Sequence, residues 1–185
     1  MNVVLLGFKG AGKTTVGPLL AERLGFRFDD LDRRIERAGA ERLGAERLGE
    51  ALTFREVFRR MGEEAFRALE RELLGEALAE EGLLLALGGG AGLDPASAEM
   101  LRAHCVVHLR APEADLLRRI REGGWPAYLD GESDPEEAMR ALLARRLPRY
   151  AEMADVVVEN PDGAAPEGVA REAAERVRER LRVRS

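Results

Sequence analysis

Residues 7–14, Gly7-Phe8-Lys9-Gly10-Ala11-Gly12-Lys13-Thr14, decide the fold. They match the pattern G-x-x-x-x-G-K-[ST], in which glycines let successive backbone N–H groups turn towards phosphate oxygens. An apolar run at 2–6 predicts a buried strand before this loop, and the apolar spacing at 15–24 predicts a helix after it. With this composition the motif arises by chance in only about 7 of 10,000 chains. The stretch therefore predicts a nucleoside-triphosphate site between a strand and a helix.

The residues of this loop have separate expected roles. Lys13 would reach the β- and γ-phosphates, and the Thr14 hydroxyl would ligate Mg²⁺. The ATP contacts are expected from the loop and the start of the helix: Gly10, Ala11, Gly12, Lys13, Thr14 and Thr15. The chain has two lysines against 27 arginines. Because it uses arginine where charge alone suffices, the retained Lys13 indicates a need for a compact ammonium.

Length and composition exclude several classes of protein. The chain has 185 residues, 45% hydrophobic and 34% charged, which predicts one domain with a core. One cysteine excludes a disulfide framework and a Cys₄ zinc site. The start of the chain does not resemble a secretory signal, and no apolar run approaches the roughly 18 residues of a membrane span. A net charge of −5 argues against nucleic-acid binding. We expect a cytoplasmic monomer that binds neither nucleic acid nor membrane.

Strand patterns alternate with helical patterns along the whole chain. Strands are predicted at 2–6, 26–30, 83–87, 105–109 and 156–158, and helices at 15–24, 95–102, 112–121, 135–146 and 167–181. Residues 35–82 are mostly helical by pattern, with breaks near Gly44, Gly49 and Gly62. This alternation predicts an α/β fold, a three-layer P-loop NTPase sandwich with a parallel five-stranded sheet and helices on both faces, as a single domain over 1–185. A tandem AERLG repeat at 40–49 is interpreted as a local duplication that lengthens a helical loop.

Weaker signals follow other predicted strands. Carboxylates at 29–32 could hold Mg²⁺ through water and accept a proton from an attacking hydroxyl, or form a solvated helix start. Three glycines at 88–90 allow close backbone approach to a ligand, or make a plain turn. His104, Cys105 and His108 are interpreted as part of a buried strand rather than as metal ligands, because no carboxylate or second cysteine is nearby.

Taken together, four segments resemble the successive motifs of shikimate kinase. They are GFKGAGKTTVGPLLAERLGFRFDDLD at 7–32, FREVFRRMGEEAFRALE at 54–70, LALGGG at 85–90 and LLARRLPRYAEMAD at 142–155. The resemblance implies a nucleoside-monophosphate-kinase-like fold, and transfer of the γ-phosphate of ATP to the 3-hydroxyl of shikimate. It also implies a helical substrate-binding region at 31–62 and a lid loop at 122–134.

The resemblance assigns roles to individual residues. Asp32 would bind the substrate hydroxyl and act as the base, and Asp30 would hold Mg²⁺ through water. The backbone of Gly89 would contact shikimate, and the guanidinium groups of Arg67 and Arg146 would bind its carboxylate. Planar arginines suit such a role because a guanidinium can bind a carboxylate through two hydrogen bonds.

The lid loop departs from the family pattern. Trp125-Pro126-Ala127-Tyr128-Leu129 stands where the family usually has Arg-Pro-Leu-Leu. Arg118, Arg119 or Arg121 could replace the missing arginine, and Arg119 is also expected to lie against adenine. We expect Trp125 to be substantially exposed without ligand, with packing onto the core as the alternative.

Other functions stay open at this point. The segment between the Asp pair and Gly62 is longer than the family pattern, which leaves the acceptor less certain than the reaction. The alternatives are a kinase of a nucleoside monophosphate or of another small hydroxy acid such as gluconate, and a nucleotide-binding regulator with weak turnover.

Overall fold

The computed structural model describes residues 1–45, 51–126, 129 and 131–184. Its sheet consists of β1 (Val3–Leu6), β2 (Arg27–Asp30), β3 (Leu83–Ala86), β4 (Cys105–Arg110) and β5 (Val156–Glu159). All neighbouring strands are parallel, in the order β2-β3-β1-β4-β5. The predicted five-stranded parallel sheet is confirmed.

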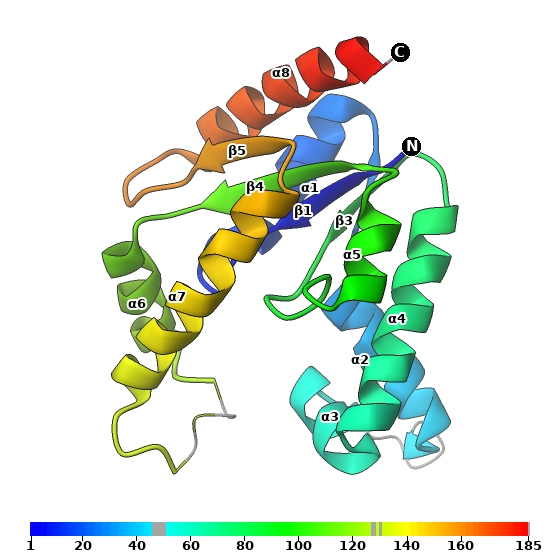
Figure 1. The fold of residues 1–185 in the computed structure, drawn as a ribbon, viewed down its shortest axis with the longest axis vertical. Helices are drawn as coiled ribbons and strands as arrows, with labels where there is room; N and C mark the ends of the chain where they lie inside the picture. Colours follow the sequence, from blue (N-terminus) through cyan, green and yellow to red (C-terminus); the bar gives the residue numbers. More distant parts are fainter. Residues whose placement is uncertain (46–50, 127–128, 130, 185) are drawn as a thin grey trace.

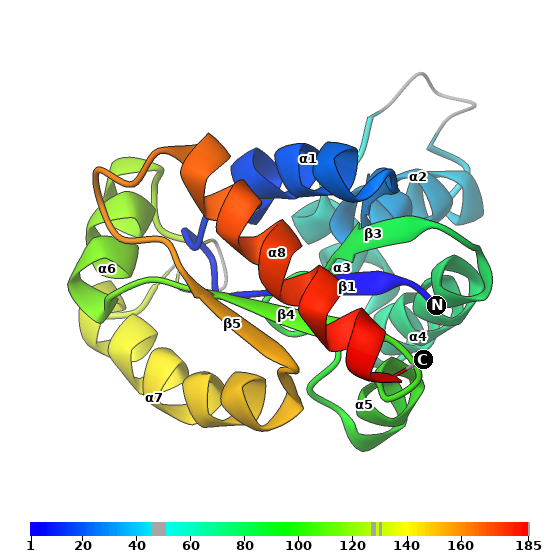
Figure 2. The same ribbon diagram turned by 90° about the horizontal axis from the view of Figure 1, so that it is seen from above.

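Helices cover both faces of this sheet, as the alternation of elements predicts. In chain order they are α1 (Lys13–Leu24), α2 (Leu31–Arg42), α3 (Phe54–Met61), α4 (Glu63–Ala79), α5 (Pro95–Leu101), α6 (Glu113–Glu122), α7 (Pro135–Met153) and α8 (Pro166–Arg184). Figure 1 shows α8 above the sheet and α4, α5 and α7 below it, and Figure 2 shows α8 crossing the strands on the α1 side. The fold is a three-layer α/β sandwich.

The central strand β1 contributes side chains to both layers of the core. Val3 and Leu5 of β1 pack into the cluster that includes α1 and α8, whereas Val4 and Leu6 pack into the cluster on the opposite face. Successive side chains of a strand point to opposite faces, and both faces are covered here, so the run must be apolar at every position. All four side chains are buried.

The position of β1 determines where a ligand can bind. β1 and β4 are neighbours, and the chain leaves β1 towards β2 on one half of the sheet but leaves β4 towards β5 on the other. In open parallel sheets such a switch point leaves room for ligands at the carboxyl ends of the strands. The 7–14 loop follows β1 at this edge, and the glycine turn at 88–90 follows β3. Figure 1 shows α6 and α7 on one side of this edge and α2, α3 and α4 on the other.

Three local predictions need correction. The helix predicted to end at Arg146 continues to Met153 through Pro148, because the turn after the proline buries Tyr150 in the core. His104 precedes β4 rather than sharing a strand face with His108. The helix predicted from Thr15 begins at Lys13, inside the glycine-rich motif.

Other predictions about the helical region have mixed outcomes. The break at Gly62 is confirmed, with a φ of 78° between α3 and α4. The break predicted at Gly49, and most of the second AERLG copy, lie outside the described residues. Within the described part of the chain, no helix has the length and apolar character needed to cross a membrane.

Candidate active site

The 7–14 loop curls around the amino end of α1. Gly10 and Gly12 have φ angles of 83° and 93°, a region that disfavours residues with a Cβ. Lys13 folds back so that Nζ donates to the carbonyls of Gly7 at 2.7 Å and Phe8 at 3.1 Å. Gly12 caps α1 without a side-chain hydrogen bond, so the helix presents its first N–H groups and its positive dipole end to the loop. These features suit an anion with several oxygens.

Residues distant in sequence hold this loop from behind. The buried amide of Asn160 donates to the Ala11 carbonyl at 2.8 Å. Arg119 donates to the carbonyls of Gly10 and Asn160, each at 3.0 Å, and pairs with Asp162 at 2.9 Å. A Cβ on Gly12 would lie 2.4 Å from Asn160 Nδ2, so the glycine is required sterically as well as by its φ angle. Sequence reasoning missed Asn160, although its rarity as one of two asparagines was a usable signal.

The carboxylates after β2 occupy an unusual electrostatic environment. The Asp30 side chain caps α2 by accepting from the Asp32 N–H at 2.9 Å. Burial raises the pKa of Asp32 to about 7; the Asp30 carboxylate raises it further, and Lys13 opposes both. Asp32 Oδ1 is buried and has no hydrogen-bond partner among the described residues. A buried acceptor without a partner costs free energy, so a ligand hydroxyl that donates a hydrogen bond to it would be stabilising.

Lys13 belongs to the same electrostatic cluster. Burial lowers its pKa to about 8, while the charges of Asp32 and Asp30 raise it. The structure thus brings three predicted site residues, Lys13, Asp30 and Asp32, within range of one another's charge.

The glycine turn after β3 connects this cluster to the predicted arginines. A Cβ on Gly88 would lie 2.4 Å from Asp32 Oδ1. A Cβ on Gly90 would lie 3.6 Å from Arg146 Nη2 and 3.8 Å from Arg67 Nη1. The two guanidinium groups, from α7 and α4, therefore converge at one end of the turn, and the buried carboxylate of Asp32 lies at the other.

Both arginines are oriented by neighbouring groups. Arg67 Nη1 pairs at 2.7 Å with Glu70, which is 3% exposed, and its Cζ lies 5.6 Å from the centroid of the Phe66 ring. Burial raises the pKa of Glu70, and the Arg67 charge opposes this shift. Arg146 Cζ lies 5.9 Å from the centroid of the Phe8 ring. Sequence reasoning did not single out Glu70, although its i, i+3 spacing from Arg67 predicts such a pair.

The residues predicted to hold Mg²⁺ could supply only part of its ligands. Thr14 is exposed in the first turn of α1, where its hydroxyl is accessible, and Asp30 lies beside Asp32. No group of three His, Cys, Asp or Glu side chains in the described ranges is arranged to hold a metal ion. Oxygen donors of this kind fit Mg²⁺, which usually keeps several waters and takes its remaining ligands from substrate phosphates.

The lid region differs from its prediction at Trp125. This side chain is partly buried and packs against the main core cluster, so the expectation of substantial exposure is wrong. Contact of a large aromatic ring with apolar side chains is favourable, and it holds Trp125 against the core despite the flexible glycines before it. Leu129 is buried in the same cluster, whereas Ala127 and Tyr128 lie outside the described residues.

The three arginines considered as replacements for the lid arginine differ in their hydrogen-bond and ion-pair partners. Arg118 pairs with Asp162 and Glu122, and Arg121 pairs with Glu136. Of the three, Arg119 alone has a hydrogen bond to the phosphate loop in the described structure.

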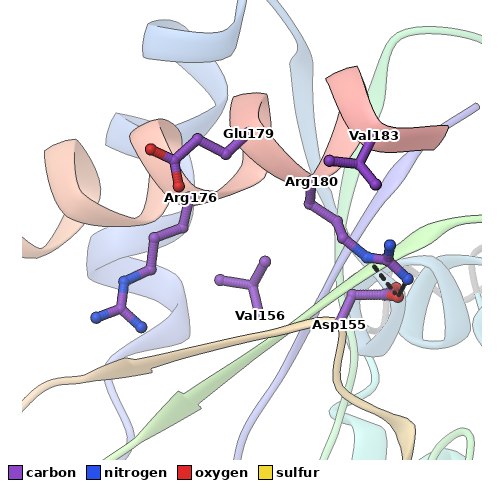
Figure 3. A pocket seen from close by; sticks show the side chains of 6 residues that line it. All are labelled: Asp155, Val156, Arg176, Glu179, Arg180 and Val183. Atoms are coloured by element: carbon purple, nitrogen blue, oxygen red, sulfur yellow. Dashed lines mark hydrogen bonds and ion pairs between the residues drawn. The ribbon is translucent and has the colours of Figure 1, made fainter. Parts of the chain in front are cut away.

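A pocket of about 310 Å³ lies elsewhere, between the start of β5 and α8 (Figure 3). It is lined by Asp155, Val156, Arg176, Glu179, Arg180 and Val183. Arg180 pairs with Asp155, and Arg176 pairs with Glu172, each at 2.8 Å. Both arginines that line the pocket therefore already have acidic partners. It opens at the amino end of β5, away from the edge where parallel sheets bind ligands. The candidate active site therefore stays at the 7–14 loop.

Comparisons with known proteins show which family the chain is similar to. A family model described as shikimate kinase matches residues 9–181. The shikimate kinase of Thermobifida fusca is 43% identical over 155 residues, which cover 84% of this chain and 83% of that protein. The shikimate kinase of Geobacter sulfurreducens is 41% identical over 180 residues, which cover 96% and 91%.

Solved structures give the same result. A shikimate kinase from Acinetobacter baumannii in complex with shikimate is 35% identical, with a TM-score of 0.79 over 96% of this chain and 93% of that one. A gluconokinase from Sinorhizobium meliloti is 22% identical with a TM-score of 0.57, covering 100% and 97%, and shows the shared fold alone.

Proposed function

The chain belongs to the shikimate kinase family, and we propose that it transfers the γ-phosphate of ATP to the 3-hydroxyl of shikimate. The products would be ADP and shikimate 3-phosphate. The observation that carries the proposal is the arrangement of Asp32, Arg67 and Arg146 around the glycine turn at 88–90.

This arrangement matches a small hydroxy acid in size and chemistry. Asp32 abuts Gly88, and the two guanidinium groups approach Gly90, two residues further on. Two residues of extended chain span at most about 7 Å. One small ring can therefore place a carboxylate against the arginines while one of its hydroxyls reaches the carboxylate of Asp32. The glycines remove side chains that would otherwise fill this space.

Asp32 suits the role of general base. A pKa of about 7 leaves a large fraction of this carboxylate ionised at neutral pH, and yet makes it basic enough to take a proton. As Asp32 takes the hydroxyl proton, the hydroxyl oxygen bonds to the γ-phosphorus, and the bond from that phosphorus to the β–γ bridging oxygen breaks. The electron pair of this bond leaves with ADP.

The phosphate loop would stabilise the charge that develops on the transferred group. Lys13 and the N–H groups at the start of α1 bind the phosphates. The protein holds these donor groups in position before the substrate binds. Mg²⁺, held by Thr14, by Asp30 through water and by the phosphates, would supply further neutralisation of phosphate charge. Arg119 lies against the loop, where its charge acts on the same region.

An acceptor panel tests the proposal. ADP release is measured with shikimate, gluconate, CMP and AMP in parallel, with a no-acceptor control for ATP hydrolysis and mass spectrometry of each product. We expect turnover and a phosphorylated product with shikimate, and background rates with the other three. Turnover with gluconate instead would assign a different hydroxy acid. ATP binding without turnover on any acceptor would support the regulator alternative.

A further inference from the structure

Tyr150 lies in the motif that contains Arg146 but has no role in the reaction described so far. The two residues are four apart on α7, so they project from the same side of the helix. The Tyr150 ring is fully buried, and its hydroxyl donates to the carbonyl of Gly89, the middle glycine of the turn. A Cβ on Gly89 would lie 3.2 Å from Arg146 Nη1 and 3.4 Å from the Tyr150 hydroxyl. One turn of α7 thus cradles this glycine.

His108 supports the Tyr150 ring from the sheet. The two rings meet edge to face, with their centroids 5.4 Å apart and an angle of 61° between their planes. His108 is 2% exposed, and neither ring nitrogen has a hydrogen-bond partner in the described part of the chain. Burial lowers its pKa to about 4; the Arg110 and Lys13 charges act in the same direction and Glu159 opposes them. A neutral imidazole here contributes packing rather than charge.

The hydrogen bond to Gly89 controls the orientation of one peptide unit. In a trans peptide the carbonyl of one residue and the N–H of the next point in opposite directions. With the Gly89 carbonyl held by Tyr150, the Gly90 N–H must therefore point away from Tyr150. This peptide lies between the end of the turn that abuts Asp32 and the end where Arg67 and Arg146 converge. Glycines alone cannot fix such a plane, because they populate many backbone conformations.

We propose that Tyr150 is a positioning residue for the acceptor, acting through the Gly89–Gly90 peptide, with His108 as its packing support. The hydroxyl of Tyr150 sets the orientation of this peptide and, with it, the spacing between the base and the carboxylate-binding arginines. The inference rests on the proposed function, because it assigns this spacing to the binding of shikimate. Tyr150 contacts the glycine turn through Gly89 and packs on His108, so we expect its effect chiefly on the acceptor.

The substitution Tyr150→Phe tests the inference, because it keeps the ring and its contact with His108 while removing the donor. We expect the KM for shikimate to rise roughly five- to tenfold, as for the loss of one buried hydrogen bond, with the KM for ATP within about twofold of the wild type. We also expect the Gly90 amide to exchange its hydrogen faster, measured residue by residue by NMR.

Met139→Ala is the matched control. Met139 is buried in the same helix about three turns before Tyr150, so its truncation weakens packing without removing the bond to Gly89. We expect this variant to unfold at a lower temperature and to keep both KM values.

Three results would overturn the inference or the function on which it rests. A KM for shikimate unchanged in Tyr150→Phe would remove the positioning role. Equal increases in both KM values, in Tyr150→Phe and Met139→Ala alike, would reduce Tyr150 to a packing residue. A wild type that does not phosphorylate shikimate would refute the proposed function instead, and the Gly90 exchange rate would then decide by itself whether Tyr150 orients the turn.

Discussion

The phosphate loop after β1 and the glycine turn after β3 lie at the ends of adjacent strands, yet they are built in opposite ways. In the phosphate loop, protein donors already satisfy the carbonyls of Gly7, Phe8, Gly10 and Ala11. Beside the glycine turn, one buried oxygen of Asp32 has no hydrogen-bond partner within the described part of the chain, and two guanidinium groups converge. In the first region the protein satisfies the carbonyls in advance and leaves the N–H groups at the start of α1 for an anion. In the second region a buried carboxylate oxygen is left for a ligand to satisfy.

This difference follows from what each region must recognise. A triphosphate presents many equivalent oxygens, so backbone N–H groups bind it well if the loop is rigid. A small acid presents one carboxylate and a few hydroxyls, which require side chains of defined charge and direction. Burial of Asp32, with the nearby Asp30 charge acting in the same direction, is the source of its raised pKa, and this pKa makes it a suitable base.

The largest effect should come from removing Asp32, the proposed base in the acceptor region. We expect Asp32→Asn to lower kcat on the order of a hundredfold or more, because the amide cannot accept the proton. The wild-type kcat/KM for shikimate should fall as the pH drops below about 7, since protonation removes the basic form. This dependence should disappear in the variant. Steady-state kinetics between pH 5.5 and pH 8.5 provide the measurement.

Stability separates loss of the base from loss of the fold. The pKa of Asp32 is raised in the folded protein, so its contribution to stability is present at low pH and is lost as the pH rises through about 7. Asp32→Asn removes a buried charge at pH 8 and should unfold no more easily than the wild type there. A variant that unfolds more easily at pH 8 and binds ATP weakly would contradict this account.

The next largest effect concerns the two arginines that we propose bind the substrate carboxylate. Arg67→Lys replaces a planar fork with a single ammonium, so we expect the KM for shikimate to rise about tenfold with little change in the KM for ATP. Arg145→Lys is the control, because Arg145 is exposed on α7 next to Arg146 and undergoes the same change in chemistry. Weaker ATP binding with normal shikimate binding in Arg67→Lys would show that the two regions are wrongly assigned.

A smaller effect is expected on the nucleotide side. Asn160→Ala leaves the Ala11 carbonyl without its donor, so we expect the KM for ATP to rise about fivefold while the KM for shikimate stays constant. Asn2→Ala is the matched control at the other end of the sheet. The Asn2 amide donates to the carbonyls of Leu78 and Glu80 and accepts from the Leu83 N–H.

The control should lose stability without a kinetic change, because it breaks more hydrogen bonds but none near the phosphate loop. If both asparagine variants raise the KM for ATP equally, the loop responds to general loosening, and Asn160 has no specific role.

Sequence reasoning succeeded where a local pattern carried the information. The 7–14 motif and the apolar run before it predicted the central strand and the loop, and alternating patterns predicted the parallel sheet. It failed where contacts between residues distant in sequence determine the structure. Asn160 reaches Ala11 across 149 residues, and no periodicity records such a bond. The sequence pattern predicted that this helix ends at Arg146, but α7 continues to Met153 and buries Tyr150.

The site shows the same division between local patterns and distant contacts. The motif and the family resemblance named Lys13, Asp32, Arg67 and Arg146 as separate positions. Their common centre at the glycine turn depends on how α4, α7 and β3 pack, which the chain order does not reveal. The raised pKa of Asp32 likewise depends on burial and on neighbours that only the folded chain brings together.

The smallest effect is expected at Trp125, where the lid lacks the arginine of the family pattern. Arg119 already lies against the phosphate loop, so adding a second cation by Trp125→Arg should change kcat by less than about threefold. The substitution should cost stability, on the order of 1–3 kcal/mol, because the Trp125 ring packs against the core cluster. Steady-state kinetics and thermal unfolding of the same preparation measure both quantities.

An Arg119→Ala background turns this small effect into a sharper comparison of the two cation positions. Removing Arg119 should lower kcat, and Trp125→Arg should then recover part of the loss if position 125 faces the phosphates during the reaction. A tenfold increase in kcat from Trp125→Arg in the wild-type background would mean that Arg119 does not act on the transferred phosphate. In that case the contacts of Arg119 with Gly10 and Asn160 would hold the loop in place without neutralising charge on the transferred phosphate.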